Sequence, residues 1–303
     1  MMMILLKQIF VMYVLMFVGF FLYRKKMVTD EGARDIGKIL LNIVIPVIVI
    51  SNFWIEKTPE RTADLLHSMI ISSLCMFISI VISYFIYHKR NRIDEFSTCF
   101  SNAGFIGIPL VQATLGSGAV FFISMMIVLV GVLQWTYGVY TITDERKYIN
   151  LNKIVTNPIV NSVLIGLLIY VAGVPMPSVV NNVFTLISAM NTPLAMIVSG
   201  VYLAQSNILT VIRKKEVYVT SFVRLILIPV VTVFVFRFIR FGSQDLKLAI
   251  LIAGACPVGA NVAVFAQQYD KDYRRGIENV CVSTILSILT LPFIVYLASL
   301  ILS

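Results

Sequence analysis

Two segments, residues 102–109 and 254–261, combine glycine, proline and asparagine inside apolar runs. The first reads Asn-Ala-Gly-Phe-Ile-Gly-Ile-Pro and the second Gly-Ala-Cys-Pro-Val-Gly-Ala-Asn. Glycine lets a backbone leave helical geometry, and proline removes an amide donor and displaces the carbonyl one turn earlier. Freed amides and half-helix N-termini attract anions, whereas freed carbonyls suit cations. The two segments therefore predict two backbone interruptions that bind a charged ligand.

The asparagines that flank these interruptions are the strongest side-chain candidates. Their amide groups can donate to a carboxylate, and their carbonyl oxygens can ligate a cation. The alternative is that each asparagine only hydrogen-bonds a neighbouring helix. The candidate binding residues of the two segments are Asn102, Gly104, Gly107, Pro109, Pro257, Gly259 and Asn261.

Other candidates are polar residues and prolines in further apolar runs. Asn42 and Asn191 each shortly precede a proline, and either line the site or cap a broken helix. Arg224 is the only basic residue well inside an apolar run; it either snorkels toward the headgroups or supplies positive charge to an anionic substrate. The remaining candidates are Pro46, Ser51, Gln134, Pro193 and Gln267.

The composition of the 303-residue chain shows what kind of elements must position these residues. Apolar residues make up 59% and charged residues 13%, and the mean hydropathy is +0.92. So few charges cannot cover the surface of a soluble domain, so we expect an all-α polytopic membrane protein. The four cysteines lie in apolar stretches without paired spacing, which predicts neither a disulfide framework nor a zinc site.

Ten apolar runs are long enough to cross a membrane as helices. The expected spans are residues 4–23, 36–54, 65–87, 97–113, 117–142, 157–173, 178–205, 216–239, 245–268 and 277–301.

An internal repeat relates the two halves of the chain. Pro46 and Pro109 are 63 residues apart, and Pro193 and Pro257 are 64 apart, at an offset of 147 to 148 residues. Five spans per repeat is an odd number, so we expect two inverted five-helix repeats, residues 1–150 and 151–303, as in secondary transporters. The fourth and ninth spans carry the interruptions. Prolines that stand alone in their runs predict ordinary kinks; these are Pro229 and Pro292.

The basic residues of the loops predict the orientation. With the N-terminus outside, 17 lysines and arginines fall on the cytoplasmic side and 6 on the other, which predicts outside N- and C-termini in the plasma (cytoplasmic, inner) membrane. Most of the net charge of +9 then lies in the cytoplasmic loops, where it sets the orientation of the protein. Nucleic acid is therefore not an expected partner.

Residues 102–109, followed by Leu115-Gly116, resemble the fourth-helix signature of the auxin efflux carrier family. Residues 255–261, with Ala266 and Tyr269-Asp270, resemble that family's ninth helix. The resemblance covers essentially the whole chain and implies ten helices in two inverted repeats. It also implies that helices four and nine cross near their prolines, and that a transport part moves against a scaffold like an elevator. Plant PIN carriers export auxin, and bacterial relatives include malate and malonate permeases, so the implied substrate is an organic anion.

We therefore expect a secondary carrier that binds a small organic anion where helices four and nine cross. Its other expected partner is the lipid bilayer, with homodimerisation left open and no cofactor. No Asp or Glu lies at the centre of a predicted span, and Asp245 and Glu278 are expected to be solvated near span ends. Coupling to Na⁺ or H⁺ and uniport both stay open.

Several alternatives remain. The closest is a sodium symporter of the bile-acid-transporter type; a channel or a sensor is the alternative from another class. An enzyme is not expected, because the only histidines, His67 and His88, lie near span ends and no metal or nucleophile motif accompanies them.

Overall fold

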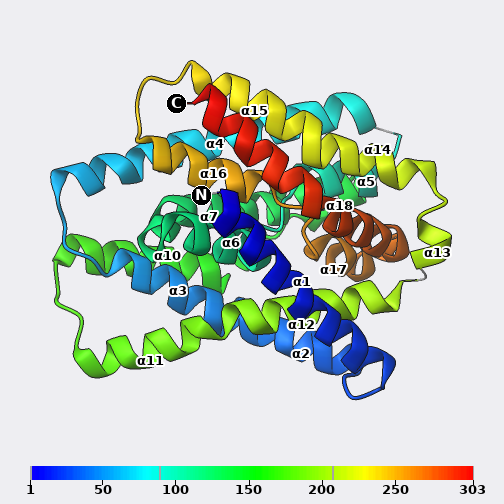
Figure 1. Ribbon diagram of the computed structural model, residues 1–303, viewed down its shortest axis with the longest axis horizontal. Coiled ribbons are helices and arrows are strands. Elements are labelled where there is room, and N and C mark those ends of the chain that lie inside the picture. Colours follow the sequence, from blue (N-terminus) through cyan, green and yellow to red (C-terminus); the bar gives the residue numbers. More distant parts are fainter. Residues whose placement is uncertain (1, 89, 207, 303) are drawn as a thin grey trace.

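The computed structural model describes residues 2–88, 90–206 and 208–302. Within these residues it consists of helices joined by turns and loops, with one isolated β-bridge (Figure 1). Lys89, which enters our orientation count, lies outside the described residues. The α-helices are α1 (Met2–Arg24), α2 (Asp30–Ile39), α3 (Ile45–Phe53), α4 (Pro59–Tyr87), α5 (Arg92–Cys99), α6 (Ile108–Leu115), α7 (Val120–Leu133), α8 (Val139–Thr143), α9 (Leu151–Val155), α10 (Pro158–Ala172), α11 (Ser178–Ala189), α12 (Asn191–Gln205), α13 (Ile208–Val211), α14 (Lys215–Phe222), α15 (Ile228–Arg237), α16 (Gln244–Ala255), α17 (Asn261–Gln268) and α18 (Tyr273–Ile301). Between them lie the π-helical turns η1 (Leu40–Val44), η2 (Ala103–Gly107), η4 (Gln134–Gly138) and η6 (Val223–Leu227), and the 3-10 turns η3 (Ser117–Ala119) and η5 (Arg146–Tyr148).

Seven of the described helical segments are long and apolar enough to cross a membrane. They are Met2–Arg24, Asp30–Phe53, Pro59–Tyr87, Ser117–Thr143, Ser178–Gln205, Lys215–Arg237 and Tyr273–Ile301. The bent pair Arg146–Val155 and Pro158–Ala172 makes eight if it is one span. The predicted spans outside this set are the fourth and ninth, each divided into shorter helices. The chain is thus a helical polytopic membrane protein, while the count of ten remains a prediction.

A π-helical turn precedes three of the prolines. The residue before the proline donates its amide five residues back: Ile45 to Leu40, Ile108 to Ala103 and Ile228 to Val223. Proline has no amide to continue the four-residue ladder, so the turn before it widens. Pro229, predicted to be an ordinary kink, therefore shares the local geometry of Pro46 and Pro109, whereas Pro292 lies inside the continuous helix α18.

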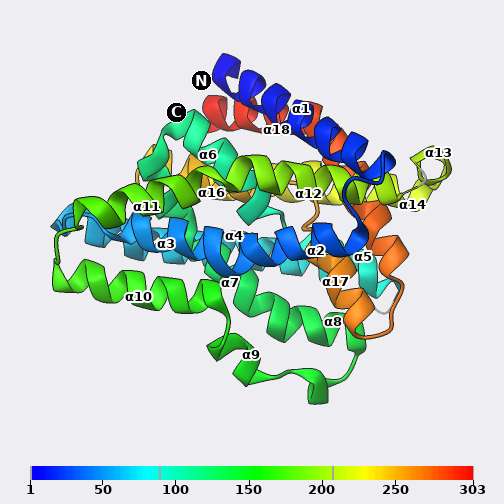
Figure 2. The same ribbon diagram turned by 90° about the horizontal axis from the view of Figure 1, so that it is seen from below.

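Helix α1 crosses α12 at glycines on both helices. A methyl group on Gly200 would overlap the carbonyl oxygen of Met16, and one on Gly19 would overlap that of Ile197. The two backbones touch directly, as small residues permit between membrane helices. The crossing anchors one group of helices, α1–α3 and α10–α12, which we call the wall group (Figure 2).

A second glycine contact in the wall group stands at the repeat offset from the first. Gly166 lies 147 residues after Gly19, and a methyl group there would lie 2.8 Å from Cβ of Phe53. This contact joins α10 to α3, so helices at corresponding positions of the two halves pack in corresponding ways. The agreement supports the internal repeat, whose inverted arrangement stays a prediction.

The helices α4–α8 and α14–α18, which include the two broken spans, form the crossover group. Helix α16 packs against α4, α6, α7, α15 and α18 and is buried along most of its length. The broken ninth span therefore lies in the protein interior, where irregular backbone is tolerated.

Candidate functional site

The two broken spans lie against each other where their helices stop. Ser101 and Val258 form an antiparallel β-bridge. The Asn102 amide donates to the Pro257 carbonyl at 2.9 Å, and the Gly259 amide donates to the Phe100 carbonyl at 3.0 Å. These bonds replace some of the helical hydrogen bonds that the two segments lose at their breaks. They also hold the two interruptions in register.

A small pocket of about 60 Å³ lies beside this crossing. The predicted site residues that line it are Asn102, Gly104, Gln134, Gly259 and Asn261. Within it the Asn261 amide nitrogen donates to the Gln134 side-chain oxygen at 3.0 Å. The structure therefore brings together five of the candidates, from three predicted spans.

Two half-helix N-termini face this pocket. Asn102 immediately precedes η2, and Ala260 immediately precedes α17; both line the pocket. At α17 the amides of Val262 and Ala263 already donate to the carbonyls of Gly259 and Ala260, at 3.2 and 3.3 Å, so they are not free to bind a ligand. Each helix N-terminus nevertheless carries about half a positive charge. The pocket is thus suited to a small anionic group.

Three further candidates build the crossing without lining the pocket. A methyl group on Gly107 would lie 3.3 Å from Cα of Ala253, so this glycine lets η2 and α16 approach closely. Pro109 and Pro257 are buried in the same region.

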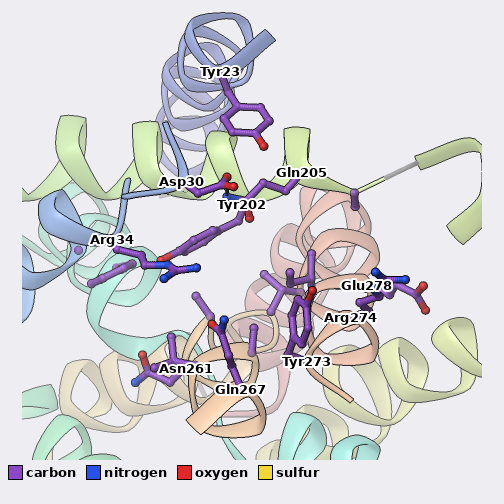
Figure 3. A pocket seen from close by; sticks show the side chains of 18 of the residues that line it. Tyr23, Asp30, Arg34, Tyr202, Gln205, Asn261, Gln267, Tyr273, Arg274 and Glu278 are labelled. Atoms are coloured by element: carbon purple, nitrogen blue, oxygen red, sulfur yellow. Dashed lines mark hydrogen bonds between the residues drawn. The ribbon is translucent and has the colours of Figure 1, made fainter. Parts of the chain in front are cut away.

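A larger cavity of about 950 Å³ adjoins the small pocket, and the two share the lining residues Leu41, Phe105, Ala260 and Asn261. It lies between the wall group and the crossover group (Figure 3). Four basic and two acidic side chains line it: Arg34, Lys38, Lys214, Arg274, Asp30 and Glu278. The candidate Gln267 also lines it, on α17 below Arg34 and Tyr202 in the view. Basic side chains therefore outnumber acidic ones in the lining of this cavity, which adjoins the crossing at the small pocket.

Arg224 is only 1% exposed and faces the crossing itself. Its guanidinium donates to the carbonyls of Thr98 at 2.9 Å, Cys99 at 3.5 Å and Cys256 at 3.1 Å, and to that of Gly254. It neither snorkels to a surface nor lines either cavity described here.

The other candidates lie outside the two cavities described. Asn42 is exposed and donates to the Lys38 carbonyl, and the Asn191 side chain is buried with no hydrogen-bond partner among the described residues. The structure does not bring the remaining three to the pocket: Pro46, Ser51 and Pro193.

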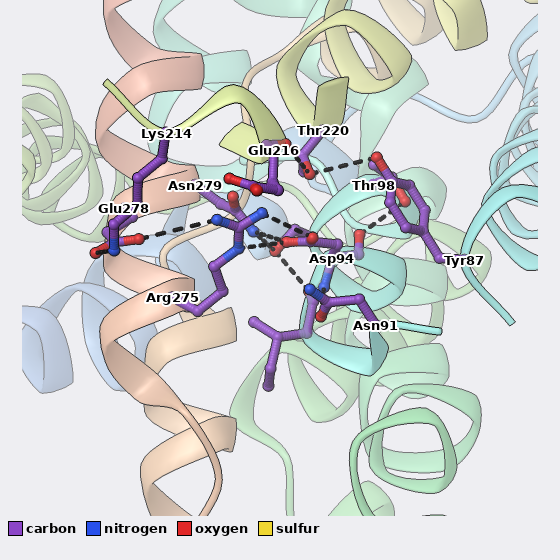
Figure 4. A network of polar contacts seen from close by, with 12 residues as sticks. Tyr87, Asn91, Asp94, Thr98, Lys214, Glu216, Thr220, Arg275, Glu278 and Asn279 are labelled. Atoms are coloured by element: carbon purple, nitrogen blue, oxygen red, sulfur yellow. Dashed lines mark hydrogen bonds and ion pairs between the residues drawn. The ribbon is translucent and has the colours of Figure 1, made fainter. Parts of the chain in front are cut away.

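Two buried carboxylates of α5, Asp94 and Glu95, are residues that sequence reasoning missed; Figure 4 shows the surroundings of Asp94. Asp94 accepts two bonds from Arg275, both 2.9 Å, and a third of 2.7 Å from Asn279. Glu95 accepts from Tyr137 at 2.6 Å. The sequence places both acids next to a basic loop, where solvated charge is the ordinary expectation. Glu278, expected to be solvated, is instead largely buried and pairs with Lys214.

Replacing Asp94 by asparagine should lower the unfolding free energy by about 3 kcal/mol, because the largely buried Arg275 loses its hydrogen-bonded counter-ion and keeps only Glu278, 4.0 Å away. Thermal unfolding of the purified protein in detergent measures this. Glu145→Gln, in the exposed pair with Lys147, is the matched control and should change little. Equal midpoints for the two variants would show that the buried pair does not stabilise the fold.

No cluster of three or more His, Cys, Asp or Glu side chains suited to a metal occurs in the part of the chain that the structure describes.

Comparison with known proteins identifies the family. The family model described as "Membrane transport protein" matches residues 4–154 and 148–295. The chain belongs to the auxin efflux carrier family. This member is 23% identical to "Uncharacterized transporter YfdV" of Escherichia coli (strain K12), over 95% of this chain and 96% of the relative. It is 22% identical to an "Uncharacterized transporter" of Methanothermobacter thermautotrophicus, over 92% and 93% of the two chains.

Family membership and the relatives' names indicate that this carrier-family protein is a membrane transporter rather than an enzyme.

Proposed function

We propose that this protein is a secondary active carrier that moves a small organic anion, a carboxylate, across the plasma membrane. One observation carries the proposal: two half-helix N-termini face one pocket, and that pocket adjoins a cavity with more basic than acidic side chains. The pocket of about 60 Å³ suits one carboxylate group, and the rest of the substrate would lie in the larger cavity.

An elevator-type mechanism fits the position of the cavity. The large cavity separates the wall group from the crossover group, so a movement of one group against the other would change its access. Two inverted repeats of five helices would supply a symmetry-related second state, open to the opposite side. Repeat-related contacts at Gly19 and Gly166 support this proposal.

The orientation proposal is that both termini are outside. The four basic side chains of the large cavity then come from segments assigned to the cytoplasmic side, so the proposal places the mouth of this cavity on that side. The family match does not favour the bile-acid-type sodium symporter, the channel or the sensor.

A thermal-shift panel tests the function directly. The purified protein is heated with a series of organic acids, each in sodium, potassium and choline buffers at several pH values. We expect one class of carboxylic acid to raise the midpoint and to be taken up by proteoliposomes. Failure of all the carboxylates, combined with stabilisation by an organic cation or a neutral solute, would refute the organic-anion proposal.

Neutralising two arginines of the large cavity should weaken substrate binding. Arg34 and Arg274 line the large cavity, and neither forms an ion pair with another described residue. The double variant Arg34→Gln/Arg274→Gln should raise the KM for uptake about 3- to 10-fold at low salt, with little change in maximal rate, because steering is electrostatic. Initial-rate uptake at two ionic strengths measures the effect.

The matched control for this variant is Arg146→Gln, an exposed arginine outside the cavity. A KM shift that persists at high salt, or that the control reproduces, would contradict electrostatic steering by the cavity.

A further inference from the structure

Arg224 contacts the ends of both broken helices at once. Thr98 and Cys99 are the last two residues of α5, and Gly254 and Cys256 lie at the end of α16. One guanidinium therefore joins the carboxyl ends of two helices that come from opposite halves of the chain. The widened turn η6 before Pro229 carries Arg224 at this depth.

The acceptors are those that a diffusible cation would use. In transporters with broken helices, freed carbonyls and the C-terminal ends of half-helices coordinate the coupling cation. Four such carbonyls converge here, and the planar guanidinium fork donates to all of them.

The charges balance without a carboxylate. Each helix C-terminus carries about half a negative charge, so two together offset about one positive charge. No ion pair joins Arg224 to an acidic residue among those described, and its surroundings include the buried cysteines Cys75, Cys99 and Cys256. The two helix ends are thus the counter-charge that keeps a buried arginine ionised.

We propose that Arg224 is a fixed internal cation that takes the place of a coupling cation at the crossing. The inference rests on the proposed carrier function and extends it: the transport cycle requires no Na⁺ or K⁺ at these carbonyls. Arg224 is a positioning residue. It holds the ends of α5 and α16, so that η2 and α17, which begin on the other side of each break, face the substrate pocket.

The test uses the full-length protein with Arg224 replaced by methionine, which removes the charge and every donor. Arg237→Met is the matched control, since Arg237 follows in the same span, is exposed, and donates to the Ile301 carbonyl. We expect Arg224→Met to lower the thermal midpoint by about 5–10 °C and uptake roughly tenfold or more, and the control to do neither.

Added guanidinium distinguishes a replaceable cation from mere packing. Low-millimolar guanidinium chloride, balanced with choline chloride, should restore a large part of both losses in Arg224→Met and should leave the wild type and Arg237→Met unchanged. Wild-type uptake should be the same when choline replaces all Na⁺ and K⁺ at a clamped membrane potential. Arg224→Lys, which keeps the charge but loses the fork, should fall between wild type and Arg224→Met.

Two results would overturn the inference: wild-type uptake that collapses when Na⁺ and K⁺ are removed, or an Arg224→Met protein that does not respond to guanidinium. If Arg224→Met cannot be purified, the ion replacement in the wild type still decides. The thermal measurement needs no substrate, so it separates the two proposals. If guanidinium restores stability but no organic anion is transported, the proposed function is wrong and the role of Arg224 at the helix ends still holds.

Discussion

Replacing Asn261 by alanine is expected to reduce substrate uptake by about 10- to 100-fold while the protein still folds. Asn261 lines both cavities and binds Gln134 across the pocket, so it is placed to donate to a carboxylate that enters from the large cavity. A hydrogen bond to a charged group contributes about 1.5–3 kcal/mol, which corresponds to this loss. We expect Asn102→Ala, on the opposite broken span, to act similarly. Uptake into proteoliposomes at matched protein content measures both.

A third asparagine provides the control. Asn42 also lies in an apolar run before a proline, but it is exposed, bonds only to the carbonyl of its own helical turn, and lines neither cavity. Asn42→Ala should transport at the wild-type rate. Normal uptake by both Asn102→Ala and Asn261→Ala would remove the proposed site, and a strong defect in Asn42→Ala would show that the assay reports general damage.

Placing a methyl group on Gly200 should destabilise the fold by about 3 kcal/mol, near the upper end of the usual cost of overpacking. The added carbon would overlap the backbone of Met16, which cannot rotate away as a side chain could. Because Gly200 and Gly19 hold α12 against α1, the two helices must separate along the wall group. The thermal midpoint of Gly200→Ala in detergent should fall by roughly 6–12 °C for a chain of this size.

Gly118→Ala is the matched substitution, because a methyl group there would meet nothing within 4 Å. It should leave the midpoint unchanged. If Gly200→Ala melts with the wild type, the close approach of α1 and α12 is not present in the folded protein.

Seven of the ten predicted spans match long apolar helices because apolar length is a local property, as are the glycines and prolines that mark the breaks. The helix that carries Asp94 and Glu95 was harder: α5 begins at Arg92, whereas the expected span begins at 97, and the charged residues between them suggest a loop. The partner of Asp94 is Arg275, 181 residues later, and that of Glu95 is Tyr137, 42 residues later; no local pattern reports such partners.

Arg224 shows a different limit of sequence reasoning. Its depth in an apolar run marked it as important, but two roles remained open. The structure gives it main-chain acceptors, and a carbonyl oxygen belongs to every residue type, so no residue pattern could have named them. The convergence of the two asparagines and Gln134 depended on how the two breaks pack, which the sequence only suggested through the repeat.

The arginine held at the crossing has an electrical consequence. If the crossover group moves as a unit, the guanidinium travels out and returns in each cycle and contributes no net current. If no proton accompanies the substrate, the charge moved per cycle is that of the anion alone, and transport would be electrogenic. A voltage of 100 mV, negative inside, is worth about 2.3 kcal/mol for each charge. For uncoupled transport of a monovalent anion, this voltage would favour efflux over uptake by roughly 50-fold.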